Sequence, residues 1–180
     1  MLDAIKAKVG HTLETNKLLR KMFSNFEDTN IHKQLAVHQE PTKGTFFIVT
    51  ELVDGDLGAL KTRLNINSSS VGLQQRLGAM SNILDQGAQG ISELHSLGLT
   101  HGDIKAANIL YKVKKDPLDK STVKTPTVED IVDGKVKIVI GDFDSADSKD
   151  IPEQLKQSRL GSLTHAAPET NFFNNIRKIP

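Results

Sequence analysis

The chain has 180 residues, of which 37% are hydrophobic and 25% charged, the composition of an ordinary globular domain. Lysine and arginine number 23 against 22 aspartate and glutamate, so no charge excess points to nucleic acid or an anionic membrane. Cysteine is absent, which excludes disulfides and thiolate metal sites. No apolar run approaches the roughly 20 residues of a membrane span, and the first residues are not those of a signal peptide. We expect a soluble, intracellular, cytoplasmic protein.

The beginning of the chain predicts a helix followed by a β-hairpin. Apolar residues recur at helical spacing over 4–26, most regularly over 12–23. Branched and aromatic residues over 31–38 and 45–53 predict two antiparallel strands. Pro and Gly in the intervening 39–44 predict the turn that joins them.

The middle of the chain predicts two further helices. Residues 57–64 suit a short helix, and the polar run 65–70 suits a loop. The longest helix follows, and Gly98 marks its C-terminal end. We expect its apolar stripe to be buried; the stripe comprises Leu73, Leu77, Met80, Leu84, Ile91 and Leu94.

Two short strands are predicted in the second half, at 109–113 and 136–140. The charged segment between them, 114–134, is too long for a tight hairpin and predicts a solvent-exposed insertion that the fold does not need. A helical turn fits 128–132 within it. No long periodic helix is evident over 145–180.

The most informative stretch is the polar segment 100–110, T-H-G-D-I-K-A-A-N-I-L, which lies between apolar runs. It places Asp103, Lys105 and Asn108 in the spacing H-x-D-x-K-x-x-N. A carboxylate here can orient an attacking hydroxyl and accept its proton, and the amide five residues on can hold a metal that neutralises nucleotide phosphates. The spacing therefore suits phosphoryl transfer.

Three motifs, in order, resemble those of protein kinases. The segment 100–110 resembles the catalytic loop, 140–144 (I-G-D-F-D) a variant of the D-F-G turn, and 161–169 the segment ending in A-P-E. The resemblance implies a partial protein kinase-like domain of α+β class. Residues 1–52 would be an N-lobe remnant of helix and hairpin, and 53–180 an incomplete, mainly helical C-lobe.

The resemblance implies roles for four side chains. Asp103 would be the catalytic base, and Lys105 would stabilise charge on the transferred phosphoryl group. Asn108 and Asp142 would bind Mg²⁺. The lysine at position 105 is typical of the serine/threonine branch. ATP and a protein with a serine or threonine hydroxyl are the implied substrates, with no nucleic acid and no membrane insertion.

The second strand of the expected hairpin resembles the strand that enters the kinase hinge. By that resemblance the adenine would bond to backbone groups of Glu51 and Val53. Thr50 would lie at the back of the pocket, Leu110 beneath the ring and Asp56 near the ribose. Without the catalytic loop, the same stretch is a strand that ends at a turn, and this alternative stays open.

Several positions depart from the kinase pattern. Gly102 replaces the usual Arg, which disfavours control by activation-loop phosphorylation, and Asp144 replaces the Gly of D-F-G. Glu14 is either the carboxylate of the regulatory helix or a solvated helical residue. A Gly-rich phosphate loop and the strand Lys are not found, so we expect the isolated chain to be inactive.

Two alternatives to an active protein kinase remain. A pseudokinase that serves as a scaffold or binding module would explain Asp144 and the missing elements. A small-molecule kinase of the aminoglycoside phosphotransferase type would explain the triplet 101–103, H-G-D, although Lys105 and the A-P-E ending argue against it. The oligomeric state is left open by the sequence.

Overall fold

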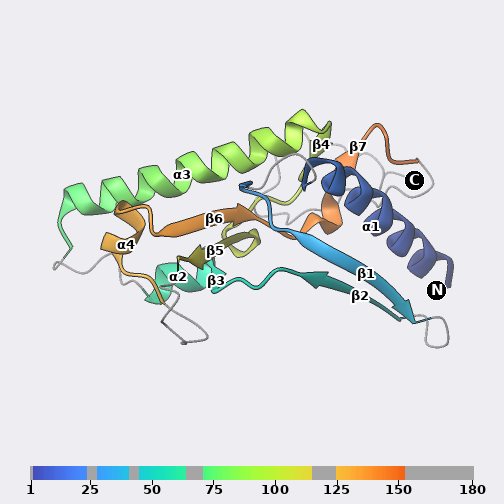
Figure 1. The fold of residues 1–180 in the computed structure, drawn as a ribbon, viewed down its shortest axis with the longest axis horizontal. Helices are drawn as coiled ribbons and strands as arrows, with labels where there is room; N and C mark the ends of the chain where they lie inside the picture. Colours follow the sequence, from blue (N-terminus) through green and yellow to red (C-terminus); the bar gives the residue numbers. More distant parts are fainter. Residues whose placement is uncertain (1, 24–27, 41–44, 64–70, 115–124, 153–180) are drawn as a thin grey trace, which may run out of the picture.

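The computed structural model describes residues 2–23, 28–40, 45–63, 71–114 and 125–152. A long helix, α3, lies along a small three-stranded sheet (Figure 1). The first helix and a β-hairpin lie toward one end of that sheet, and two short helices lie toward the other (Figure 1). Helices and strands together form an α+β fold. No helix in the described part of the chain has the length and apolar character that a membrane span requires.

The N-terminal helix and hairpin form as the sequence predicts. Helix α1 is Leu2–Phe23, and strands β1 (Gln34–Glu40) and β2 (Thr45–Thr50) pair antiparallel. Strand β1 begins later than expected, because Ile31 instead forms a parallel bridge with Ile140. The hairpin is thereby attached to the sheet through the residues that precede it.

The central sheet is antiparallel, with β5 (Ile109–Val113) between β3 (Gly55–Asp56) and β6 (Val136–Ile140). The two longer strands have the predicted bounds. A further pair, β4 (Leu99–Thr100) and β7 (Asp147–Ser148), joins the end of α3 to the last described residues. One 3₁₀ turn lies between β4 and β5, and another lies between β6 and β7.

Three helices follow the hairpin in the chain. Helix α2 is Leu57–Arg63, α3 is Leu73–Ser96 and α4 is Val128–Val132. Their positions agree with the sequence prediction, and Gly98 takes a positive φ of 70° just beyond α3, as a residue that ends a helix commonly does. The expected loop at 65–70 lies outside the described residues.

The core consists of two clusters, and β6 contributes to both, Ile140 to the first and Val136 and Ile138 to the second. Strand β6 reads V-K-I-V-I and has four buried residues, which is typical of a strand covered on both faces. The first cluster comprises Leu19, Ile31, Leu94, Leu99, Ile140, Phe143, Ala146 and Ile151. The second comprises Leu60, Ala79, Tyr111, Val113, Val128, Ile131, Val136 and Ile138.

The expectation that the apolar stripe of α3 is buried is wrong for the first half of the helix. Leu73, Leu77, Met80 and Leu84 are exposed, between 52% and 64%. The buried residues of α3 are instead Ala79, Gly87, Gly90 and Leu94. At Gly90 the absence of a side chain lets the helix approach its neighbour, because a Cβ there would lie 2.6 Å from the Asn30 carbonyl oxygen. Apolar residues of α3 line a hollow of about 430 Å³, together with residues of α2 and α4.

The expectation that 114–134 is a dispensable surface insertion is also wrong for its described part. Val128 and Ile131, both in α4, are buried in the second core cluster. Helix α4 begins at a capping box in which Thr127 and Asp130 exchange hydrogen bonds. This helix covers α3 and the sheet, so it is part of the fold. Residues 115–124 lie outside the described residues.

Candidate active site

The segment predicted to be a catalytic loop connects β4 to β5 through the 3₁₀ turn η1 (Ala106–Asn108). It leaves β4 at a sharp turn where Gly102 has a positive φ of 78°. A Cβ at this position would lie 2.5 Å from the carbonyl oxygen of Ser145, so only glycine fits here without displacement of the backbone. The loop is therefore packed tightly against the segment that follows β6.

His101 fixes the loop from the interior. Its Nε2 lies 2.8 Å from the carbonyl oxygen of Gly141, and its Nδ1 lies 3.3 Å from the backbone N–H of Asp103. Because a carbonyl can only accept and an N–H can only donate, Nε2 carries the proton and Nδ1 accepts. Burial lowers the pKa of His101 below its ordinary value of 6.5, against the raising effect of the bond to Gly141. The ring is thus neutral and structural.

Asp103, Lys105 and Asn108 converge, as the sequence predicts. The Lys105 ammonium lies 2.6 Å from Asp103 Oδ2, and the Asn108 amide nitrogen donates to the same oxygen at 3.1 Å and to the Asp103 carbonyl at 2.8 Å. Asn108 is buried and Asp103 and Lys105 are half-buried. A carboxylate, a cation and an oriented amide therefore share one small site.

The turn after β6 places Asp142 beside this site. The Gly141 N–H donates to the Asn108 carbonyl at 2.9 Å, which joins the two predicted metal-binding segments directly. Asp142 is exposed and has a left-handed backbone, with φ 62° and ψ 76°. Such a backbone is strained for a non-glycine residue, and strain of this kind often marks a functional position.

The turn is held by Phe143, which begins the 3₁₀ turn η2 (Phe143–Ser145). Phe143 is buried in the first core cluster, and its ring centroid lies 5.6 Å from that of His101. The predicted loop and turn thus pack on each other through two rings. Both rings support the fold.

The chemistry of the side chains fits a magnesium ion shared with phosphate groups. Asn108 would contribute its amide oxygen, since its nitrogen is oriented toward Asp103, and Asp142 would contribute its carboxylate. The described residues contain no group of three or more His, Cys, Asp or Glu that could hold a metal by itself. Mg²⁺ commonly takes one or two protein oxygens together with waters and substrate phosphates, and this donor set suits that mode.

The segment predicted to contact adenine lies between β2 and β3. Thr50 is the exposed last residue of β2, and Val53 is half-buried. The Glu51 carboxylate has two partners. It accepts a hydrogen bond from the Lys33 backbone N–H at 3.0 Å and forms an ion pair with Lys112 at 2.9 Å. Burial raises the pKa of the Glu51 carboxyl, but these two partners outweigh it and hold the pKa below its ordinary value.

The other two residues assigned to the nucleotide have structural partners as well. Asp56 Oδ1 accepts the Ala59 N–H at 2.9 Å, so this carboxylate caps the first turn of α2. Asp56 also pairs with Leu110 in the register between β3 and β5. The structure thus brings Asp56 and Leu110 together, on a different strand pair from Thr50.

Comparison with known proteins decides the family. The family model described as "Protein kinase domain" matches residues 6–175. The chain belongs to the protein kinase domain family. A relative from Ceratodon purpureus, a "Light-sensor Protein kinase", is 33% identical over 104 residues, which are 57% of this chain and 7% of the relative. The chain thus corresponds to a small part of that protein.

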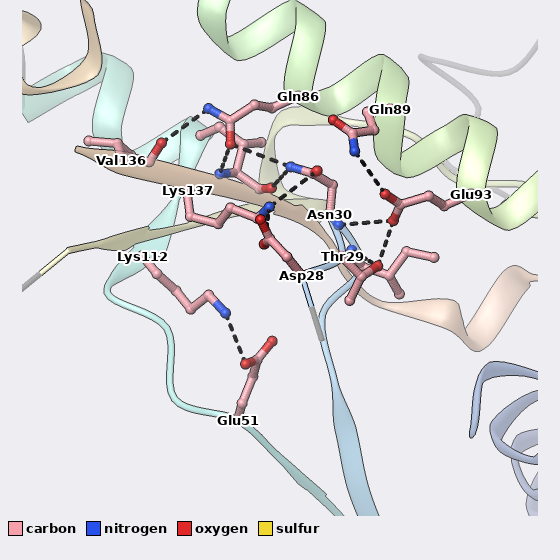
Figure 2. A network of polar contacts seen from close by, with 12 residues as sticks. Asp28, Thr29, Asn30, Glu51, Gln86, Gln89, Glu93, Lys112, Val136 and Lys137 are labelled. Atoms are coloured by element: carbon pink, nitrogen blue, oxygen red, sulfur yellow. Dashed lines mark hydrogen bonds and ion pairs between the residues drawn. The ribbon is translucent and has the colours of Figure 1, made fainter. Parts of the chain in front are cut away.

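Sequence reasoning missed the polar network that anchors this kinase domain's hairpin to α3 (Figure 2). Glu93 accepts hydrogen bonds from the Thr29 hydroxyl at 2.5 Å and the Asn30 N–H at 2.9 Å. Gln86 binds the backbone of β6 at Val136 and at Ile138. These contacts join residues at least 50 positions apart, so no local pattern could have predicted them.

Glu14 of the kinase domain pairs with a residue of its own helix. Its carboxylate lies 2.6 Å from the Lys17 ammonium, one turn along α1. This contact is the arrangement of a solvated helical residue. The A-P-E segment, 161–169, lies outside the described residues.

Proposed function

We propose that this kinase domain transfers the γ-phosphoryl group of ATP to serine or threonine hydroxyls of proteins. The observation that supports this most strongly is that the Lys105 ammonium and the Asn108 amide both contact the same carboxylate oxygen of Asp103. Residues 1–52 would contribute the small lobe up to the hinge, and 53–180 the large lobe with the catalytic loop.

In this proposal Asp103 is the general base. As the substrate hydroxyl oxygen attacks the γ-phosphorus, its proton passes to the Asp103 carboxylate, and the bond to the β-phosphate oxygen breaks to release ADP. Lys105 and Asn108 hold this carboxylate in position. The Lys105 ammonium also offers positive charge to the oxygens of the transferred group.

Asn108 and Asp142 would hold the metal that accompanies ATP. Bound Mg²⁺ would neutralise the β- and γ-phosphate charge. The backbone bond from Gly141 to Asn108 fixes the separation of the two ligand-bearing segments. The left-handed backbone of Asp142 and the exposure of its side chain leave the carboxylate accessible to a metal ion.

Titration of the full-length protein with ATP, with and without Mg²⁺, tests the nucleotide site. We expect Mg²⁺ to tighten ATP binding in the natural protein, and Asp142→Asn to remove at least tenfold of that effect, since a metal ligand supports the phosphate contacts. Asp150→Asn, which changes an exposed carboxylate two residues beyond β7, is the matched control and should leave the Mg²⁺ effect unchanged. Equal Mg²⁺ dependence in both variants would refute the assignment of Asp142.

A scaffold function is the second candidate, and Asp144 is the observation that favours it. Asp144 lies in η2, two residues after the proposed metal ligand, and its carboxylate would add negative charge near bound phosphates. A scaffold would keep the fold and show no Asp103-dependent transfer. ATP binding without transfer in the full-length protein would favour this candidate.

A further inference from the structure

His32 is a buried residue that neither the catalytic loop nor the core explains. It lies between the bridge at Ile31 and the start of β1, and 8% of it is exposed. Its Nε2 lies 3.0 Å from the backbone carbonyl oxygen of Glu51. Because that oxygen can only accept, Nε2 carries the proton and donates.

The Glu51 backbone is one of the two groups to which the kinase resemblance assigns the adenine of ATP. An adenine presents an exocyclic N–H₂ donor and ring acceptors, and a backbone carbonyl is a natural partner for that donor. The imidazole of His32 is likewise a flat heterocycle with one N–H donor at its edge. In this structure the ring already makes the bond that the base would make.

The His32 ring also lies beside the residue assigned to the space beneath the base. A Cβ built on Gly141 would lie 2.7 Å from Leu110 Cδ1 and 3.3 Å from His32 Nδ1. Both side chains therefore pack against the same point of the backbone, next to the proposed metal ligand Asp142. His32 is thus placed between the Glu51 carbonyl and the Leu110–Gly141 floor.

We propose that His32 is an internal occupant of the base subsite, which an adenine nucleotide must displace in order to bind. This inference rests on the proposed function, because ATP is the nucleotide of that function and the kinase resemblance places its adenine at the backbone of Glu51. The His32 ring occupies the space that the base would take, and its N–H already binds the Glu51 carbonyl. His32 therefore lowers the affinity of the site for adenine nucleotides.

Calorimetric titration of the full-length protein with Mg·ATP and, separately, with adenosine tests the inference. Adenosine carries the base without phosphates, so it reports on the base subsite. His32→Val removes the donor and most of the ring, and we expect it to bind both probes about tenfold more tightly, the effect of one competing hydrogen bond. His38→Val, an exposed histidine of β1, is the matched control and should bind as the natural protein does.

A second measurement does not depend on the variant folding. In ¹⁵N-labelled natural protein, Mg·ATP should shift the imidazole Nε2 resonance of His32 as its bond to Glu51 is broken, and should leave that of His38 in place. Unchanged His32 resonance at saturating ATP would overturn the inference, as would equal ATP affinity in His32→Val and natural protein.

The outcomes separate the inference from the proposed function. If the natural protein binds Mg·ATP and His32→Val binds it no better, the role of His32 is wrong and the nucleotide site stands. If neither the natural protein nor His32→Val binds Mg·ATP, the nucleotide site is refuted and the inference with it.

Discussion

Replacement of Gly102 by alanine should destabilise the protein much more than the same change at Gly134. Both glycines have a positive φ, 78° and 67°, so an L-residue at either position is strained by about 1–2 kcal/mol. Their surroundings differ: a Cβ on Gly134 would meet no atom within 4 Å, whereas one on Gly102 would lie 2.5 Å from the Ser145 carbonyl oxygen.

The additional loss of stability at Gly102 follows from the atom that the new Cβ would contact. The Ser145 oxygen belongs to the backbone, so η2 and the catalytic loop must move apart to relieve the contact. Overpacking of this kind costs roughly 1–3 kcal/mol. Gly102→Ala should therefore lose about 2–5 kcal/mol, a large share of a typical domain's roughly 5–15 kcal/mol.

Urea unfolding of the two variants, followed by circular dichroism, measures both losses against the natural protein. The difference between them isolates the contact with Ser145, because the backbone strain is common to both. Equal losses in Gly102→Ala and Gly134→Ala would refute the claim that the catalytic loop is packed against η2 at this point.

Two further predictions concern the core and the buried histidine. Ile131→Ala should lower the free energy of unfolding by about 2–5 kcal/mol, because Ile131 is fully buried, whereas the exposed neighbour Val132→Ala should cost far less; a loss below 1 kcal/mol at Ile131 would mean that α4 is not part of the core. The pKa of His101 is lowered in the folded state, so the unfolded state binds a proton more readily. The free energy of unfolding should therefore fall as the pH drops below about 6.5. The natural protein should lose more stability than His101→Gln between pH 7 and 5 in urea titrations, and identical pH profiles would contradict the buried, neutral ring.

Much of the fold could be predicted because its signals are local. The helical spacing of α1 and α3, the two strands of the hairpin and the short strands β5 and β6 are each encoded within a few adjacent residues. Burial was harder to predict, because it depends on which face meets a neighbour. Apolar residues such as Leu84 are exposed, while Gly90 is buried because its lack of a side chain lets α3 approach the Asn30 carbonyl.

In the candidate site, too, the local contacts could be predicted from the sequence and the long-range contacts could not. Asp103, Lys105 and Asn108 lie within six residues, so their convergence could be read from spacing. The contact of His101 with Gly141 spans 40 residues, and no local pattern specifies it. His32 was missed because a single histidine in a strand-like run resembles any partly exposed strand residue.

The measurement that tests the central claim most directly is phosphoryl transfer by the full-length protein from γ-labelled ATP to a serine- and threonine-containing protein substrate. Loss of a general base commonly costs 10²-fold or more, so Asp103→Asn should reduce the rate by at least about that factor. Asp133→Asn, an exposed carboxylate paired with Lys135, is the matched control and should keep the natural rate. We predict that the natural protein and the control both label serine and threonine residues of the substrate. Transfer that continues at the natural rate in folded Asp103→Asn would contradict the account.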